Sequence, residues 1–253
     1  MLPGVPKEMR QILKDSVIPI IKSRFKLKEK LRKVLRTVGL HETQIYEKLG
    51  ELEGVGFYPS FTGVDLLIEA DSRDELNSKE LLIRNKLGDY IYGEEDDTLE
   101  SCVGRLLREK KLTISVAESC TGGLVEHRIT NVPGSSEYFV GGVVAYSNEM
   151  KMKVLGVKED TLESFGAVSY ETACEMAEGV AKLTGSDVAV STTGIAGPTG
   201  GTPTKPVGLV FFGVYYKGEV KAYRHQFQGD RLLIKEQSAQ TALDLIRRTL
   251  IKE

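Results

Sequence analysis

The chain has 253 residues, of which 41% are hydrophobic and 28% are charged, and its formal net charge is −2. This composition is typical of a globular protein of one to three domains that is long enough to build sizeable cores. The small net charge gives no overall field that would attract nucleic acid or an anionic membrane.

Cysteine and histidine usage limits the chemistry further. The three cysteines are odd in number and form no CxxC pair, which argues against a disulfide framework and for a reducing compartment. The three histidines are scattered, without the spacing of a zinc site, so we expect no metal and no cofactor. No apolar run reaches the length of a membrane span, and the N-terminus lacks the apolar core of a signal peptide. We therefore expect a cytoplasmic protein with no membrane partner.

Residues 1–10 contain two prolines and a glycine, and an amphipathic apolar run follows them. This stretch resembles the tail of an upstream domain more than an independent element. We expect residues 1–19 to be the remnant of a missing N-terminal domain and its linker, either in a truncated chain or in a short version of the gene.

Residues 22–36 carry eight lysines or arginines against one acid, Glu29. A basic run of this kind can mark contact with nucleic acid. It is more often the solvated face of a strand or helix, and Phe25 is the one aromatic residue that interleaves it. We keep a nucleic-acid role as an alternative and expect no nucleic-acid partner.

The pattern of residues 33–93 predicts a small α+β unit with strands at 33–39 and 63–70 and helices at 41–52 and 73–88. No catalytic constellation occurs in it. No GxxG lies between two helices, as it does in KH modules that clamp a nucleic-acid backbone. We expect this unit to be a structural or dimerising domain.

An acidic break at residues 94–97 marks the predicted domain boundary, and Asp97 with Glu100 fits a capping box at the start of a helix. Strands and helices then alternate: a strand at 112–117, a helix at 124–130, a strand at 138–146, a helix to Leu155 capped by Ser147, a helix at 171–183 begun by Ser169, strands at 187–192, 207–216 and 219–228, and a last helix from Arg231 to near Ile251. A two-residue turn, Lys217-Gly218, joins the last two strands as a hairpin. This alternation with one hairpin predicts an α/β layer with a mixed sheet.

Three of these strands end in small polar residues or glycines, at 119–123, 146–148 and 193–197. Ligands of open α/β sheets collect outside the carboxyl ends of the strands, so these turns could converge on one crevice. The first turn opens a helix, whose free N–H groups favour a phosphate or a developing oxyanion. The loop 194–201 has four glycines and could cradle a phosphate, but it is neither a P-loop nor a GxGxxG motif.

The first turn offers two nucleophiles, Ser119 and Cys120. No histidine lies beside a suggestive turn, so a serine nucleophile would need another base, and a lysine with a lowered pKa can serve. Lys151 is the candidate because it lies one helical turn beyond the strand end at Tyr146, whose hydroxyl could orient the base or relay a proton. Arg231, at the start of the last helix, could hold a phosphate.

Each of these residues also has an ordinary structural interpretation. A lysine is usually a solvated surface residue, and a tyrosine at a strand end usually packs with a wet hydroxyl. An arginine at a helix start often forms a salt bridge, and a small buried cysteine is usually inert. The turn itself could be an ordinary connection between a strand and a helix.

Seven short motifs occur in order across residues 95–253: Ala117-Glu118-Ser119-Cys120-Thr121-Gly122-Gly123, Pro133-Gly134-Ser135-Ser136, Tyr146-Ser147-Asn148 with Lys151, Gly166-Ala167-Val168-Ser169, Gly194-Ile195-Ala196-Gly197-Pro198, Pro206-Val207-Gly208 and Gly229-Asp230-Arg231. Together they closely resemble the CinA C-terminal family, which is the nicotinamide mononucleotide deamidase family. Residues 20–93 resemble this family's middle KH-type domain, and residues 2–9 resemble the end of its molybdopterin-binding-like domain. The resemblance implies a small α+β KH-type domain at 20–93 followed by an α/β domain with a mixed sheet at 94–253.

The resemblance implies an amidohydrolase of pyridine nucleotide salvage, which converts nicotinamide mononucleotide to nicotinic acid mononucleotide and ammonia without a metal. Ser119 would attack the carboxamide, Lys151 would be its base, and Tyr146 would assist. Backbone N–H groups near residues 120–123 would stabilise the oxyanion, and we expect a homo-oligomer, a dimer or larger. The implied substrate-binding residues surround the glycine-containing turns: Glu118, Cys120, Thr121, Gly122, Gly123, Thr193, Gly194, Ile195, Ala196, Gly197 and Arg231.

One position departs from the family's pattern. An acid usually follows Gly-Ile-Ala-Gly-Pro, and here Thr199 stands in its place. If that acid touches the ribose, affinity for the nucleotide is lower in this chain. The alternative to an amidase is a non-catalytic nucleotide-binding or regulatory protein of the same family, linked to competence or to the response to DNA damage.

Overall fold

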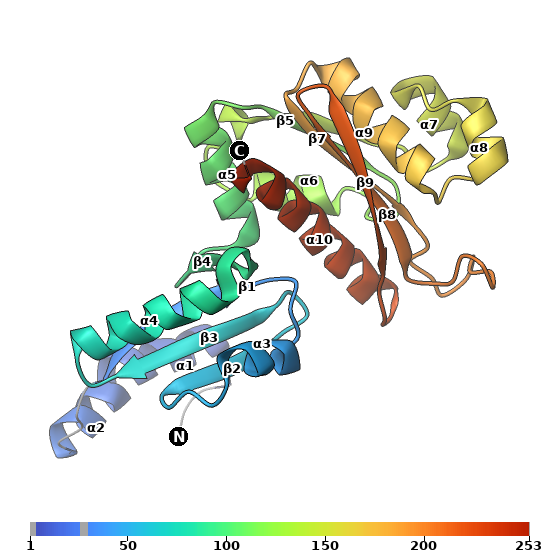
Figure 1. The fold of residues 1–253 in the computed structure, drawn as a ribbon. Coiled ribbons are helices and arrows are strands. Elements are labelled where there is room, and N and C mark those ends of the chain that lie inside the picture. Colours follow the sequence, from blue (N-terminus) through green and yellow to red (C-terminus); the bar gives the residue numbers. More distant parts are fainter. Residues whose placement is uncertain (1–3, 26–29, 253) are drawn as a thin grey trace.

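Two sheets organise the chain, and each has its own helices (Figure 1). The structure is a computed structural model, and it describes residues 4–25 and 30–252. Part of the basic run at 22–36 and the first three residues of the predicted segment 1–19 therefore lie outside the described residues.

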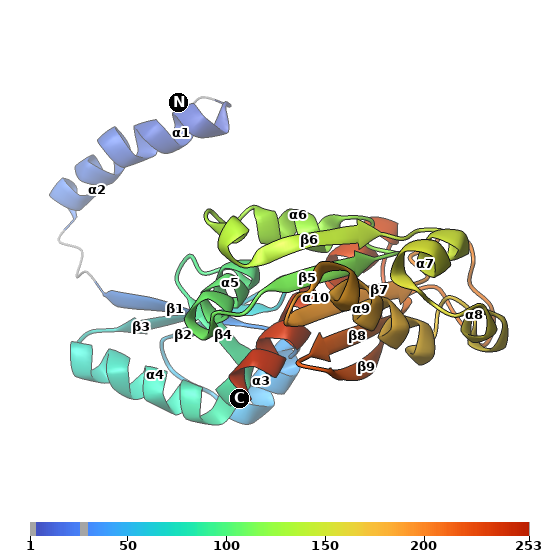
Figure 2. The same cartoon turned by 90° about the horizontal axis from the view of Figure 1, so that it is seen from above.

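A helical segment precedes the first sheet. It consists of α1 (Pro6–Ile12), the π-helical turn η1 (Leu13–Val17) and α2 (Ile18–Arg24). None of the residues in these three elements is buried, and Figure 2 shows the segment standing apart from both sheets.

The first sheet has four antiparallel strands in the order β2-β3-β1-β4. Its elements are β1 (Leu31–Thr37), α3 (Glu42–Leu49), β2 (Val55–Pro59), β3 (Val64–Ala70), α4 (Arg73–Leu87), the 3₁₀ turn η2 (Gly88–Tyr90) and β4 (Ile91–Glu94). Alternate residues of β3 are buried, because successive side chains of a strand point to opposite faces and α3 and α4 cover one face. Both helices and the strands β1 and β3 were predicted from the sequence, whereas β2 and β4 were not.

The second sheet has five strands in the order β6-β5-β7-β8-β9, of which β6, β5 and β7 are parallel and β8 and β9 antiparallel. This is the predicted mixed sheet. Its elements are α5 (Leu99–Lys110), β5 (Ile114–Glu118), α6 (Leu124–Thr130), the 3₁₀ turn η3 (Ser135–Glu137), β6 (Phe139–Val144), α7 (Asn148–Leu155), α8 (Glu159–Phe165), α9 (Tyr170–Thr184), β7 (Val188–Gly194), β8 (Leu209–Tyr216), β9 (Glu219–Gln226) and α10 (Arg231–Ile251). The helix α8 was not predicted.

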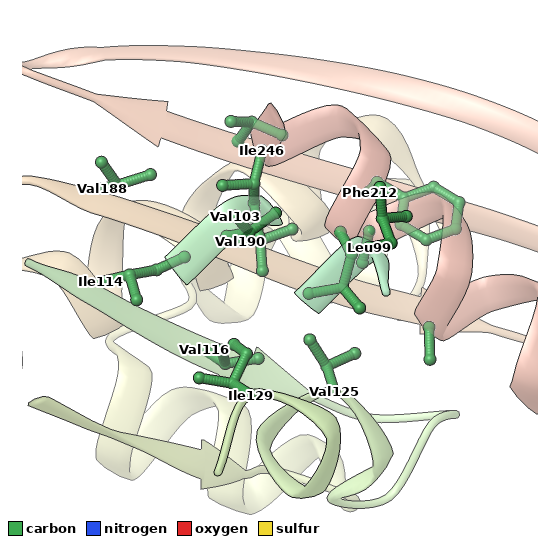
Figure 3. Close-up of a cluster of buried hydrophobic side chains, with 14 of the residues drawn as sticks. Leu99, Val103, Ile114, Val116, Val125, Ile129, Val188, Val190, Phe212 and Ile246 are labelled. Atoms are coloured by element: carbon green, nitrogen blue, oxygen red, sulfur yellow. The ribbon is translucent and has the colours of Figure 1, made fainter. Parts of the chain in front are cut away.

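Helices cover both faces of the second sheet. On one face α5, α6 and α10 pack on a core that includes Val116, Val190 and Phe212 (Figure 3). On the other face the buried side chains of α7 and α9 pack on Ala117 and Ala189, and α8 lies against α9. The central strands β5, β7 and β8 are therefore largely buried on both sides, whereas the edge strands β6 and β9 keep exposed residues.

Helix caps account for where several helices begin. Ser147 and Ser169 are the N-caps of α7 and α9, as predicted. The predicted capping box at Asp97 and Glu100 is wrong by one residue. Thr98 is the N-cap of α5 and exchanges hydrogen bonds of 3.0 and 3.2 Å with Ser101. The Asp97 carboxylate accepts instead from the N–H of Glu94, 3.1 Å away, and closes the turn before the helix.

The long helix α10 joins the two sheets. Gln240 Nε2 donates to the carbonyl of Thr62 at 2.9 Å, and the Arg247 guanidinium donates to the carbonyl of Asp89 at 2.5 Å. Both acceptors lie in loops of the first sheet, so α10 packs on its own sheet along one side and on the neighbouring unit along another.

Candidate active site

The turn after β5 lies at the edge of the second sheet where three parallel strands end. Glu118, the last residue of β5, pairs with Val144 of β6 on one side and with Thr192 of β7 on the other. Two contacts continue this pairing into the turn. The Ser119 N–H donates to the carbonyl of Thr192 at 2.9 Å, and the hydroxyls of Thr121 and Thr192 lie 2.7 Å apart. The turns that follow β5, β6 and β7 are thus neighbours in space.

The Glu118 side chain organises this turn from inside the protein. It is fully buried; Oε2 accepts from the N–H of Gly123 at 2.9 Å and Oε1 from that of Glu126 at 2.8 Å. These N–H groups open α6, where the helix dipole favours a negative charge. The carboxylate that the sequence analysis placed in substrate binding is therefore engaged by the protein. The Gly123 N–H is engaged by the same carboxylate. The N–H groups of Thr121 and Gly122, in contrast, have no protein acceptor within the described residues.

Lys151 reaches Ser119. Its side chain is 1% exposed, and Nζ lies 3.1 Å from Ser119 Oγ. The same Nζ donates to the main-chain carbonyls of Ala145 at 2.8 Å and Tyr146 at 3.2 Å. An ammonium has three donors, so these three oxygens satisfy it without a carboxylate.

Burial lowers the pKa of the Lys151 amine from its ordinary value, because the charged form is poorly solvated there. The neutral amine is therefore easier to form than on a surface lysine. In that form Nζ can accept the proton of the Ser119 hydroxyl, and this is what the activation of a serine nucleophile requires.

Cys120, the other nucleophile considered, is placed differently. Its thiol is buried within the core cluster beneath α6 and α10, and burial raises its pKa to about 12. The thiolate is the nucleophilic form of cysteine, so this thiol is unreactive near neutral pH. Of the two residues, Ser119 is therefore the better candidate for the nucleophile.

Tyr146 contacts Lys151 through its main-chain carbonyl and not through its hydroxyl. Its side chain is 62% exposed, and its hydroxyl accepts from the Arg231 guanidinium at 3.0 Å. Arg231 also donates to the carbonyl of Gly197 at 2.7 Å. The carbonyl of Tyr146 contacts Lys151, while its hydroxyl helps to tie the start of α10 to the ends of β6 and β7.

Lys235 is a candidate that the sequence analysis missed. It lies four residues after Arg231 on α10, so both cations lie on one face of the helix. Gly122 and Gly123 adopt φ values of 62° and 93°, where a side chain would be strained, and a Cβ on Gly122 would lie 3.7 Å from Lys235 Nζ. An ammonium thus lies above the glycine turn. The signal in the sequence was the spacing of the two cations at the start of a helix.

The first residues of the predicted 193–197 stretch are engaged in packing. Thr193 is buried and its hydroxyl donates to the carbonyl of Ala167 at 2.5 Å. A Cβ on Gly194 would lie 2.7 Å from the carbonyl oxygen of Leu209, so this glycine permits the close approach of β8. In this stretch Gly197 is the residue that contacts a candidate binding side chain, Arg231.

Two negative findings concern the described residues. Among them, no group of three or more histidine, cysteine, aspartate or glutamate side chains is placed to hold a metal ion. Within residues 4–25 and 30–252, no helix is both long and apolar enough to span a membrane.

Comparisons with known proteins agree on one family. The CinA C-terminal domain model matches residues 96–250, and the model of the KH domain of damage-inducible protein CinA matches residues 32–93. A putative competence-damage inducible protein of Caldicellulosiruptor saccharolyticus is 46% identical, and a CinA-like protein of Salinibacter ruber is 47% identical; each alignment covers 99% of this chain. The chain spans 64% of the length of both relatives.

Solved structures give the same answer. The crystal structure of a competence-damaged protein (CinA) superfamily protein from Klebsiella pneumoniae is 32% identical, with a TM-score of 0.60. The similarity covers 61% of this chain and 97% of that one. With the two domain models matched in order and nearly half of the residues shared with full-length relatives, this chain belongs to the CinA family.

Proposed function

We propose that this protein is an amidohydrolase that converts nicotinamide mononucleotide to nicotinic acid mononucleotide and ammonia. The observation that carries the proposal is the buried pair in which Lys151 Nζ lies 3.1 Å from Ser119 Oγ, with main-chain carbonyls as its other hydrogen-bond partners at 2.8 and 3.2 Å and no carboxylate partner among the described residues. A serine with a desolvated lysine base is an activated nucleophile for acyl transfer. The family resemblance supplies the substrate.

In the proposed reaction, Ser119 Oγ attacks the carboxamide carbon while the neutral Lys151 amine accepts the hydroxyl proton. The N–H groups of Thr121 and Gly122 are free of protein acceptors within the described residues, and they would face the developing oxyanion. Lys151 then returns the proton to the departing nitrogen, and ammonia leaves a Ser119 ester. Water, deprotonated by Lys151, cleaves the ester and releases the carboxylic acid.

The nucleotide phosphate is assigned to the cations at the start of α10. Arg231 is fixed by Tyr146 and Gly197, and Lys235 lies over Gly122. Arginine and lysine are the usual side chains for phosphate, and a fixed guanidinium loses little entropy on binding. Glu118 is proposed as a positioning residue for the turn and not as a substrate contact.

Ammonia release from nicotinamide mononucleotide tests the proposal. Ser119→Ala should lower the rate at least about 1,000-fold, because the nucleophile is lost. Cys120→Ala, the adjacent substitution, should retain most of the activity. Wild-type protein that binds the mononucleotide without releasing ammonia would instead identify a non-catalytic nucleotide-binding member of the family. Full activity of Ser119→Ala would exclude the serine mechanism.

We also propose that residues 20–93 and 94–253 fold as two domains and that the protein forms a homo-oligomer. The edge strand β6 supports self-association because it exposes Val140 and Val144, which are 50% and 43% exposed, beside unpaired backbone groups. Light scattering tests the oligomer, and a protein that is monomeric at micromolar concentration would exclude it.

A further inference from the structure

A second site lies between the two sheets, away from the Ser119 turn. It is a cavity of about 870 Å³, and its walls are the loops 38–41 and 60–63 of the first sheet, the end of β9 and the outer side of α10. Small-molecule sites in proteins have volumes of roughly 300–1,000 Å³ and often lie between domains. Neither Ser119 nor Lys151 lines this cavity.

Contacts across the cavity hold its walls in place. Gln240 of α10 donates to the carbonyl of Thr62, and the Arg248 guanidinium lies 4.9 Å from the centroid of the Tyr90 ring. Gly39 packs against this arginine so closely that a Cβ there would lie 3.3 Å from Arg248 Nη2. The cavity is therefore formed before a ligand enters, and little ordering is required for binding.

The lining combines aromatic rings with amides. Phe61 contributes a ring that is 55% exposed, and on the facing wall the rings of His225 and Phe227 stack at 11° with centroids 5.7 Å apart. Four glutamines also line the cavity: Gln226, Gln228, Gln237 and Gln240. Two of these amides are engaged by the protein: Gln226 Nε2 donates to the carbonyl of Val207 at 2.8 Å, and Gln240 donates to Thr62 and accepts from Arg128.

Gln237 adds an unmet hydrogen-bonding requirement. Its Oε1 is buried and accepts no hydrogen bond from the residues that the structure describes, which costs free energy. Because this oxygen accepts no hydrogen bond from the described residues, the amide can rotate toward an N–H or O–H group of a ligand without breaking an existing hydrogen bond.

One carboxylate holds the charged side chains at the cavity. Asp244 and Arg248 are the lysine, arginine, aspartate or glutamate side chains among the lining residues, and Arg248 Nε donates to Asp244 Oδ2 at 2.7 Å. The same carboxylate also accepts from Arg247 at 2.7 and 2.9 Å, so two guanidinium groups share it. The ligand class is therefore inferred from the rings and amides of the lining and not from its charge.

We propose that this cavity binds a nucleoside, whose base stacks on Phe61 and whose hydrogen-bonding edge meets the amide of Gln237. Stacking on an aromatic ring and reading of a base edge by a glutamine amide are the standard means by which proteins hold an unpaired base. The site is separate from the proposed amidase site and does not depend on that activity.

Isothermal titration of the full chain with adenosine, guanosine, cytidine and uridine tests the proposal. At least one nucleoside should bind with a Kd below about 1 mM. Phe61→Ala should weaken that binding about tenfold, because the stacking surface is lost. Gln237→Leu, which keeps the side-chain volume, should weaken it as well.

A control variant shows whether the nucleoside binds in this cavity or elsewhere on the protein. Tyr58→Ala removes a ring of similar exposure, 56%, from the same sheet but outside the cavity, and should leave the affinity unchanged. The proposal is overturned if none of the four nucleosides binds or if Phe61→Ala binds like the wild type.

Discussion

The two sheets use charged residues in opposite ways. In the first sheet the charges are paired across strands near the surface: Arg32 meets Glu69 at 2.7 Å, and Arg36 meets Asp65, each pair lying directly opposite in the β1–β3 register. Lys33 likewise pairs with two glutamates. The three cations that β1 contributes to the basic run at 22–36 are thus paired within the protein.

In the second sheet the charges near the candidate site are buried and face main-chain groups. Lys151 donates to two carbonyls and a hydroxyl, and Glu118 accepts from two backbone N–H groups. A buried charge held by dipoles in place of an opposite charge keeps its electrostatic influence on a reacting group. Cross-strand charge pairs thus lie on the surface of the first sheet, whereas the charged groups at the candidate site of the second sheet are buried among main-chain dipoles.

The largest effect is expected at Lys151. Lys151→Met should reduce ammonia release from nicotinamide mononucleotide at least about 1,000-fold, because the serine loses its base. Lys153→Met is the matched control, since Lys153 lies on the same helix, is 71% exposed and pairs with Glu149. Comparable losses in both variants would contradict the contrast between solitary and paired lysines.

The pH dependence of the wild-type rate sharpens this prediction. The base must be neutral, so kcat/KM should rise with pH and level off above the pKa of Lys151. Because burial lowers that pKa, the inflection should lie below the ordinary value of 10.5. An inflection at or above 10.5 would show that the reacting base is a solvated lysine or another group.

Glu118→Ala should be the most destabilising of the substitutions considered. It removes a fully buried carboxylate that caps α6 and leaves two N–H groups without their acceptors, at a cost of about 2–4 kcal/mol in the free energy of unfolding. Urea denaturation measures it. Glu149→Ala, at a 67% exposed partner of Lys153, should change stability by less than about 0.5 kcal/mol. A similar small change at Glu118 would mean that its carboxylate does not hold the turn.

Glu126→Gln tests the neighbouring carboxyl through pH. Burial, with the nearby Glu118 charge, raises the pKa of Glu126 to about 7 from 4.5. The folded state therefore holds this proton more tightly than the unfolded state, so the associated stability is complete below pH 4.5 and is lost as pH rises through about 7. Glu126→Gln should thus be more stable than the wild type by about 1–2 kcal/mol at pH 8 and by much less near pH 5. The difference at pH 8 is reduced because the carboxyl is partly exposed to solvent.

The control for that experiment is Glu163→Gln on α8, an exposed glutamate outside the site. Its effect on urea denaturation should be small and equal at the two pH values. If Glu126→Gln behaves in the same way, Glu126 is solvated and ionised like a surface acid.

How far the sequence predicts this structure depends on the distance over which each signal acts. The caps Ser147 and Ser169 were predicted because a cap acts within three residues, and the mixed sheet because hydrophobic periodicity is local. The approach of Lys151 to Ser119 was beyond the sequence. It depends on the parallel register of β5 and β6, which places Ala145 beside Glu118.

The features that the sequence did not predict involve residues in structural positions that are unusual for their type. Glu118 caps a helix from five residues before Gly123, whereas a cap normally adjoins its helix. The strand β2 contains Gly56 and Pro59, both unfavourable in strands, and forms only because β3 offers an edge.

The smallest effect is expected in the first sheet. Arg32→Ala should lower the free energy of unfolding by no more than about 0.5 kcal/mol, because its side chain is 67% exposed and an exposed ion pair gains little over hydration. A double-mutant cycle with Glu69→Ala, at low and high salt, measures the coupling directly and separates it from the packing of the arginine stem. A coupling above about 1 kcal/mol that persists in high salt would show that cross-strand charges also fix the β1–β3 register. Charged side chains would then determine the surrounding structure in both sheets, and not in the second sheet alone.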